Sequence, residues 1–186
     1  LTFRVYVIGA LALAGIPPLS GFFSKDEILA AALAANPVVF YVLLAAAFFT
    51  AFYVGRQLLL VFFGPARTEP AAQADESPAL ITVPLVGLAL LAFFGGGLNF
   101  PGNLALEHWL EHSVLIGVHG AFALPTAALA TGVALVGLAL AWLVYGRKPL
   151  ARPDETDPAA RGLGPLFAGM HRAWLIDTAY QTLIVR

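Results

Sequence analysis

Long apolar segments alternate with short polar stretches along the whole chain. A hydrocarbon core of about 30 Å needs roughly 20 apolar residues of helix. Four segments meet this length, over residues 3–35, 37–63, 79–98 and 121–145. Their weak periodicity is typical of helices that are apolar on every side, and the short alternating runs of barrel strands do not occur in the sequence. We therefore expect an all-α membrane protein with a transmembrane helix bundle over residues 1–145.

The pattern changes after the fourth segment. Residues 146–165 are polar and include Pro149, Pro153 and Pro158, so they predict a solvated linker. From Leu166 onward, apolar residues such as Phe167 and Trp174 recur at near-helical spacing with polar residues between them. Residues 166–186 are too polar to span a membrane cheaply, and they predict the start of an amphipathic surface helix at the membrane interface.

Composition supports a membrane protein and excludes other classes. Hydrophobic residues make up 60% of the chain and charged residues only 11%, against about 25% charged residues in soluble domains. A net charge of −1 offers no basic field for nucleic acid. The chain has no cysteine, which excludes disulfides, thiolate metal ligands and a cysteine nucleophile. Because it begins at Leu1 inside an apolar stretch, we interpret it as an internal fragment of a larger membrane protein.

The basic residues of the connecting segments predict the orientation. With four crossings, Arg4 and the segments 64–78 and 146–165 fall on one side of the membrane. That side holds six basic residues, and the opposite side, residues 36–37 and 99–120, holds none. The positive-inside rule then makes the 64–78 and 146–165 loops cytoplasmic in a multi-pass membrane protein. The six basic residues are Arg4, Arg67, Arg147, Lys148, Arg152 and Arg161.

The first apolar segment contains a break. As one helix, residues 3–35 would extend about 50 Å, more than the core requires. Pro17 and Pro18 each lack an amide donor, and Gly15 and Gly21 add conformational freedom on both sides. The helix should therefore unwind near residues 15–21, with Ser20 or Ser24 capping its second half. Unwound backbone at membrane depth is tolerated where it is buried in protein or lines a wet cavity.

A charged cluster follows this break at once. Lys25 lies eleven residues before Asn36, which places its amine near mid-membrane. Burial disfavours the charged form of an amine, so Lys25 is a candidate proton carrier, with Asp26 and Glu27 as acids that set its proton affinity. The alternative is a structural ion pair, or a loop nearer the surface.

Other polar residues are weaker candidates. Arg56 lies seven residues before Phe63, near the end of the second span. We expect its long side chain to reach the lipid headgroups or its guanidinium to form a structural ion pair, and a role in the proton path is the less favoured alternative. His108 and His112 stand at i and i+4, but two histidines without further ligands are weak evidence for a metal. We expect no metal site and no bound cofactor in this chain.

Two motifs carry a resemblance to a known family. They are the run GIPPLSGFFSKDEIL over residues 15–29 and the run FYVGRQLLLVFFG over residues 52–64. Together they resemble the antiporter-like membrane subunits of respiratory complex I, and most of all the distal, NuoL-type subunit of bacterial NADH–quinone oxidoreductase. The resemblance covers the late part of such a subunit, and the third and fourth spans match only in hydropathy.

The resemblance implies a proton-translocating membrane subunit of an NADH:quinone oxidoreductase, with no redox centre or redox catalysis of its own. It implies that the other membrane subunits of complex I, the lipid bilayer and protons are the partners, and that the protein lies in the bacterial inner (plasma) membrane. By position, Lys25 matches the broken-helix lysine of the family and Asp26 its acidic neighbour, and Arg56 falls on a basic position of the next helix. A lone polar break also fits half of an inverted-repeat transporter.

Two alternatives remain open at this point. The first is a large subunit of a multi-subunit sodium–proton antiporter, because such subunits share the fold and much of the motif around Lys25. The second is a structural membrane scaffold without an ion path, in which Lys25 has no transport role.

Overall fold

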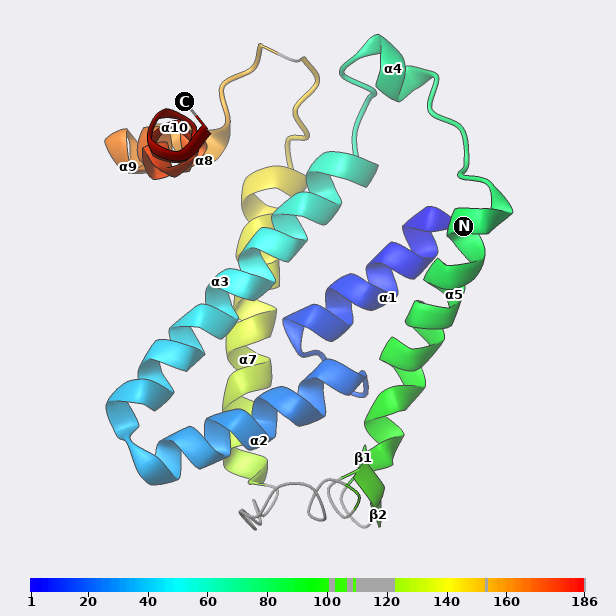
Figure 1. Cartoon of the computed structure of the whole chain (residues 1–186), viewed down its shortest axis with the longest axis vertical. Coiled ribbons are helices and arrows are strands. Elements are labelled where there is room, and N and C mark those ends of the chain that lie inside the picture. The colour runs from blue at the N-terminus through cyan, green and yellow to red at the C-terminus, as the bar shows by residue number, and fades with distance from the viewer. Residues whose placement is uncertain (101–102, 107–108, 110–122, 153, 186) are drawn as a thin grey trace.

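The computed structural model describes the chain except for residues 101–102, 107–108, 110–122, 153 and 186. It is a bundle of tilted helices with a separate run of short helices at its C-terminal end (Figure 1). The helices of the bundle are α1 (Thr2–Ala14), α2 (Ser20–Ala35), α3 (Pro37–Phe62), α4 (Glu69–Ala72), α5 (Ala79–Phe94), η1 (Gly95–Leu98), α7 (Leu124–Ala141) and η2 (Trp142–Gly146). Two short strands, β1 (Asn99–Phe100) and β2 (Asn103–Leu104), pair antiparallel after η1.

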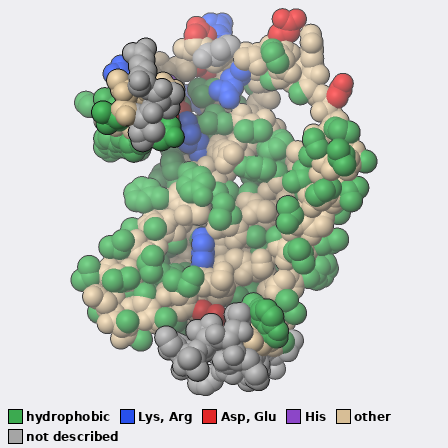
Figure 2. All heavy atoms as spheres, viewed as in Figure 1, with side chains coloured by type: hydrophobic (Ala, Val, Ile, Leu, Met, Phe, Trp, Pro, Cys, Tyr) green, Lys and Arg blue, Asp and Glu red, His purple; other side chains and the backbone are tan. Residues whose placement is uncertain are grey.

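Three of these helices are long and apolar enough to cross a membrane, over Pro37–Phe62, Ala79–Leu98 and Leu124–Gly146, and Thr2–Ala14 is a shorter apolar helix. The predicted all-α membrane helix bundle is therefore confirmed. Large apolar side chains cover much of the surface of these helices (Figure 2), as a hydrocarbon solvent requires. The first two residues of the predicted span 121–145 lie outside the described residues, as do His108 and His112.

The predicted 3–35 span consists of two helices. α1 ends at Ala14 and α2 begins at Ser20, and the peptide bond between Pro17 and Pro18 in the connection is cis. The predicted serine cap is wrong, because Leu19 precedes the first turn of α2 and no side chain caps it. Ser20 lies inside that turn, and the Ser24 hydroxyl donates instead to the Gly21 carbonyl oxygen at 3.4 Å.

Small residues allow the helices to pack closely. α3 and α7 lie side by side (Figure 1), and Ala51 and Ala141 between them are fully buried. A Cβ atom added to Gly137 of α7 would lie 2.8 Å from the Phe48 carbonyl oxygen of α3. Close backbone approach through small residues is typical of helix pairs in membranes, where association depends on packing.

Both ends of the bundle gather chain segments that are distant in sequence. The starts of α1 and α5 and the ends of α3 and η2 lie at one end, together with α4 and the linker (Figure 1). The turn between α2 and α3 and the start of α7 lie at the other end. Lys, Arg, Asp and Glu side chains gather at the first end (Figure 2), which is the end that carries the basic connecting segments.

The C-terminal region is more broken than a single surface helix. It consists of α8 (Pro158–Leu163), α9 (Pro165–His171), η3 (Ala173–Leu175), α10 (Ile176–Tyr180) and η4 (Gln181–Val185). Thus α8 lies within the predicted linker 146–165, because Asp157 caps it and Pro158 occupies its first turn. Three consecutive residues with positive φ, Ala173 to Leu175, interrupt the predicted 166–186 helix, and this conformation cannot continue an α-helix.

The close contact between α1 and α2 predicts that Gly21 tolerates no side chain. A Cβ atom there would lie 2.0 Å from the Ala12 carbonyl oxygen. We expect Gly21→Ala to lower the free energy of unfolding by about 1–3 kcal/mol through overpacking. Gly9→Ala in α1 is the matched control, since a Cβ there meets nothing within 4 Å, and it should be neutral or mildly stabilising. Thermal unfolding of the detergent-solubilised protein measures both, and equal melting temperatures would contradict the prediction.

Candidate functional site

The end of α1 leaves backbone acceptors without their usual donors. Gly15, with φ 81°, closes the helix, and the N–H groups of Gly15 and Ile16 bond to the carbonyl oxygens of Ala12 and Leu11. The next donors in the helical pattern would come from Pro17 and Pro18, which have no N–H. The carbonyl oxygens of Leu13 and Ala14 therefore cannot form their α-helical hydrogen bonds.

Lys25 supplies a donor to one of these carbonyls. Its Nζ atom donates to the Leu13 carbonyl oxygen at 2.5 Å, from the second turn of α2 back across the break. Gly15 makes room for the stem of the lysine, because a Cβ atom at Gly15 would lie 2.8 Å from Lys25 Cδ. The helix break and the half-buried lysine thus form one unit, in which the two prolines create the acceptor that the amine uses.

A cavity of about 210 Å³ lies beside this lysine. It is lined by Lys25 and apolar residues of α2 and by the facing residues of α3, including Thr50. Its lining is mostly apolar, with Lys25 and Thr50 as its polar residues, and the Thr50 hydroxyl donates to the Ala46 carbonyl oxygen at 2.8 Å. With a share of about 30 Å³ per water molecule, a cavity of this volume has room for several waters.

Asp26 is the most unusual side chain of the site. It lies on the buried stripe of α2 with Phe23 and Leu29, and it is only 1% exposed. Neither of its carboxylate oxygens has a hydrogen-bond partner among the described residues. Asp26 therefore does not pair with the Lys25 next to it in this structure. Buried polar groups are normally satisfied, so an orphan carboxyl group requires an explanation from a proton, from water or from a further chain segment.

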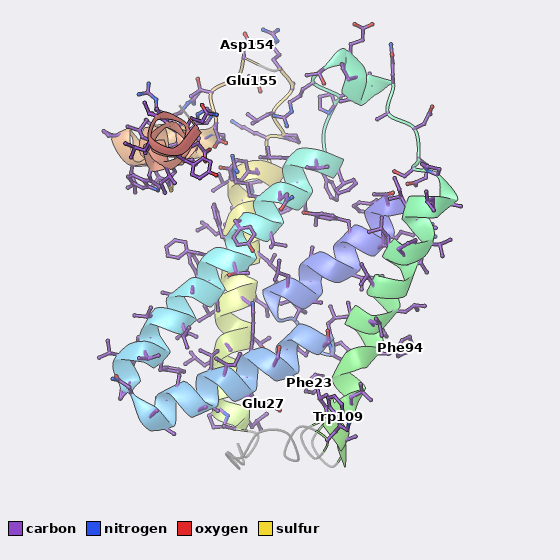
Figure 3. The ribbon with its side chains drawn as sticks, in the orientation of Figure 1. Phe23, Glu27, Phe94, Trp109, Asp154 and Glu155 are labelled. Carbon is purple, nitrogen blue, oxygen red and sulfur yellow. The ribbon has the colours of Figure 1, made fainter. Side chains whose placement is uncertain are left out.

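The other predicted acid, Glu27, is half-buried on α2 near the end of the bundle where α7 begins (Figure 3). Phe23, one turn earlier, is buried where α2 meets η1, and a Cβ atom added to Gly96 would lie 2.5 Å from its ring (Figure 3). The acidic pair after Lys25 is thus split between the interior of the bundle and a less buried position.

Arg56 lies in a second polar cluster at the basic end of the bundle. Its guanidinium forms an ion pair with Asp157 at 2.5 Å, and its Nε donates to the Tyr145 hydroxyl at 3.0 Å. The Tyr145 hydroxyl donates to Asp157 at 2.7 Å, and the Ala159 N–H donates to the same carboxylate at 2.8 Å. We call Arg56, Tyr145 and Asp157 the linker clamp, because they tie α3, η2 and the start of α8 together. These contacts support the structural-pair interpretation of Arg56.

Sequence reasoning missed Tyr145 and Asp157. It treated residues 146–165 as a plain connector, although Asp157-Pro158 is a recognisable helix-start signal and Tyr145 ends an apolar span. Partial burial acts to raise the pKa of Asp157. The hydrogen bonds from Arg56, Tyr145 and the Ala159 N–H outweigh this effect, so the pKa of Asp157 lies below its ordinary value.

The depressed pKa of Asp157 predicts how the clamp depends on pH. A carboxyl group with a lowered folded-state pKa stabilises the fold fully above its unfolded value of about 3.9, and this contribution disappears as the pH falls through the folded value. Asp157→Asn should cost about 1–2 kcal/mol at pH 7, because Arg56 keeps its burial and loses its counter-charge. The exposed Asp154→Asn should cost nothing measurable (Figure 3).

Thermal unfolding in detergent at pH 7 and below pH 4 tests the clamp. The difference in melting temperature between wild type and Asp157→Asn should shrink at the lower pH. A difference that is independent of pH, or equal effects of the two asparagine variants, would rule the clamp out.

The described residues contain no group of three His, Cys, Asp or Glu side chains that could hold a metal ion. The site therefore consists of a lysine, an orphan carboxyl group, unwound backbone and a cavity. This set of groups can bind and release protons.

Comparison with known proteins places these features in a family context. A family model described as "NADH:quinone oxidoreductase/Mrp antiporter, TM" matches residues 1–50, which include the helix break and Lys25. NADH-quinone oxidoreductase subunit L of Mycobacterium tuberculosis is 42% identical over 158 residues, 81% of this chain and 25% of that protein. The chloroplast NAD(P)H-quinone oxidoreductase subunit 5 of Mesostigma viride is 31% identical over 197 residues, 100% of this chain and 29% of that protein.

A third relative, NAD(P)H-quinone oxidoreductase chain 5 of a Picosynechococcus strain, is 30% identical over 221 residues and is matched over 31% of its length. The chain thus spans about a quarter to a third of the curated relatives that it matches. These matches confirm the resemblance that the motifs around Lys25 and Arg56 indicate. The chain therefore belongs to the family of antiporter-like membrane subunits of NADH–quinone oxidoreductase.

Proposed function

We propose that this chain is part of a proton-translocating membrane subunit of an NADH–quinone oxidoreductase, and that Lys25 is a protonatable residue of its proton path. The observation that carries the proposal is the bond from Lys25 to the Leu13 carbonyl beside the 210 Å³ cavity. Relatives named as subunits of such oxidoreductases support the assignment to that assembly. The proposed role of this chain requires only proton movement, and the proposal assigns electron transfer to other subunits.

The Leu13 carbonyl holds the lysine in place in either protonation state. An ammonium group has three N–H donors and a neutral amine has two, so both forms can donate to the same acceptor. Lys25 also lines the cavity, where water can deliver or accept the proton. Lys25 can therefore exchange its proton without losing its position, which a proton carrier in a fixed path requires.

Asp26 is the next residue in the proposed path. An ionised carboxylate without donors is costly in a buried position, whereas a protonated carboxyl group is much cheaper. Asp26 thus fits a group that takes up a proton when one arrives and is unstable as a lone anion. Glu27, less buried and one residue further, is proposed as an auxiliary acid, and Arg56 is assigned to the linker clamp.

The proposal also assigns an environment to each surface of the chain. Its lipid-like apolar exterior faces the bilayer and the other membrane subunits of the complex. The basic end, with the 64–78 and 146–165 loops, faces the cytoplasm of a bacterial cell under the positive-inside rule.

Replacement of Lys25 tests the proton path. In the intact complex, reconstituted in proteoliposomes, Lys25→Gln should reduce proton pumping at least tenfold, because glutamine keeps a donor to Leu13 but carries no exchangeable charge. Lys25→Arg should retain the donor and still pump poorly, since arginine does not release its proton in proteins. Lys148→Gln is the matched control, because Lys148 is exposed in the linker, and it should pump normally.

Proton uptake is followed with a pH-sensitive dye, and NADH:quinone reductase activity of the same samples reports assembly. Normal pumping by Lys25→Gln with intact reductase activity would support the scaffold alternative. Sodium movement coupled to proton movement in the opposite direction, with both signals lost in Lys25→Gln, would support the sodium–proton antiporter alternative.

A further inference from the structure

An apolar groove of about 420 Å³ lies at the basic end of the bundle, apart from the Lys25 cavity. Leu58, Leu59 and Phe63 of the α3 end form one wall, and Leu138 and Trp142 form the other. Pro149 of the linker closes the groove at its end. The groove therefore lies between two membrane-crossing helices, and its closed end is at the level where the chain leaves the bundle.

Close packing keeps these walls in place. A Cβ atom at Gly55 would lie 3.0 Å from the Ala141 Cβ, so α3 and α7 touch along the floor of the groove. Gly64, with φ 100°, lies under Pro149, and a Cβ there would be 2.9 Å from the proline ring. The linker clamp holds the same segment through Asp157. The groove is thus a formed feature of the fold.

Arg147 lies next to one wall of the groove. Its guanidinium is 5.8 Å from the centre of the ring of Trp142, which lines the groove, and both side chains are exposed. Arg147 follows the lining residue Gly146, and the ion pairs among the described residues do not include it. An apolar slot next to an uncompensated arginine at a membrane boundary complements an amphiphile with an anionic head and an apolar tail.

The position of the groove favours a lipid over a protein segment. It lies between two helices that are long and apolar enough to cross a membrane, where acyl chains are the surrounding solvent. Trp142 beside the charge is also typical of the level of the lipid headgroups.

We propose that this groove binds one anionic phospholipid, with an acyl chain along Leu58, Leu59 and Leu138 and the phosphate on Arg147. The bound lipid fills the space between the ends of α3 and α7 and seals the bundle beneath the linker. This site is independent of the proton path, because it shares no lining residue with the Lys25 cavity.

The test counts lipids in the intact complex that contains this chain. The complex is purified in mild detergent from membranes rich in phosphatidylglycerol, and native mass spectrometry with lipid extraction gives the number retained per complex. Leu59→Trp fills the groove and should remove one tightly retained phosphatidylglycerol. Arg147→Gln should lower retention of that lipid at least threefold and abolish its preference over phosphatidylcholine.

Two matched variants serve as controls. Val61→Trp adds the same bulk to α3 at a side chain that is 63% exposed and does not line the groove, and Arg152→Gln removes an exposed linker charge. Both should retain the lipid. The proposal is overturned if Leu59→Trp keeps the full lipid count, or if a photo-cross-linker at Trp142 captures protein instead of lipid. Proton pumping failure in Lys25→Gln has no bearing on this result.

Discussion

A backbone carbonyl that has lost its hydrogen-bond partner in a water-poor environment is the constraint on which the site depends. Pro17 and Pro18 withhold the donors that Leu13 and Ala14 need, and the bilayer offers no water to replace them. The chain meets this need at Leu13 with the amine of Lys25. The missing donors therefore link the break in the helix to a half-buried lysine beside a cavity.

Two polar clusters within the same apolar bundle differ in how fully they are satisfied. In the linker clamp, the side chains of Arg56, Tyr145 and Asp157 form hydrogen bonds with one another, and these bonds hold their segments together. At the helix break, the amine has one backbone acceptor and the Asp26 carboxyl group has no partner in the described structure. Unused hydrogen-bonding capacity in a low-dielectric interior is costly, so the helix break is the less stable of the two clusters.

Small residues give these clusters their fixed geometry. Gly21 lets the first turn of α2 press against the backbone of α1, which sets the distance that Lys25 must reach. The alanines and glycines between α3 and α7 bring Tyr145 close enough to Arg56 for a direct bond. Because apolar association gains little inside a bilayer, close van der Waals packing of this kind is what holds the elements in register.

The sequence by itself determined the membrane class, the apolar segments, the break at the two prolines and the lysine after it, because hydropathy and missing N–H groups are local properties. It also carried the Asp157-Pro158 helix start, which sequence reasoning overlooked in a polar linker. Only the tertiary structure decided that Lys25 bonds to Leu13, that Asp26 faces inward without a partner, and that Arg56 binds Asp157 a hundred and one residues later. Those outcomes depend on how α1, α2, α3 and α7 cross and on which backbone carbonyl groups lack a hydrogen-bond donor after packing. No single stretch of sequence encodes either property.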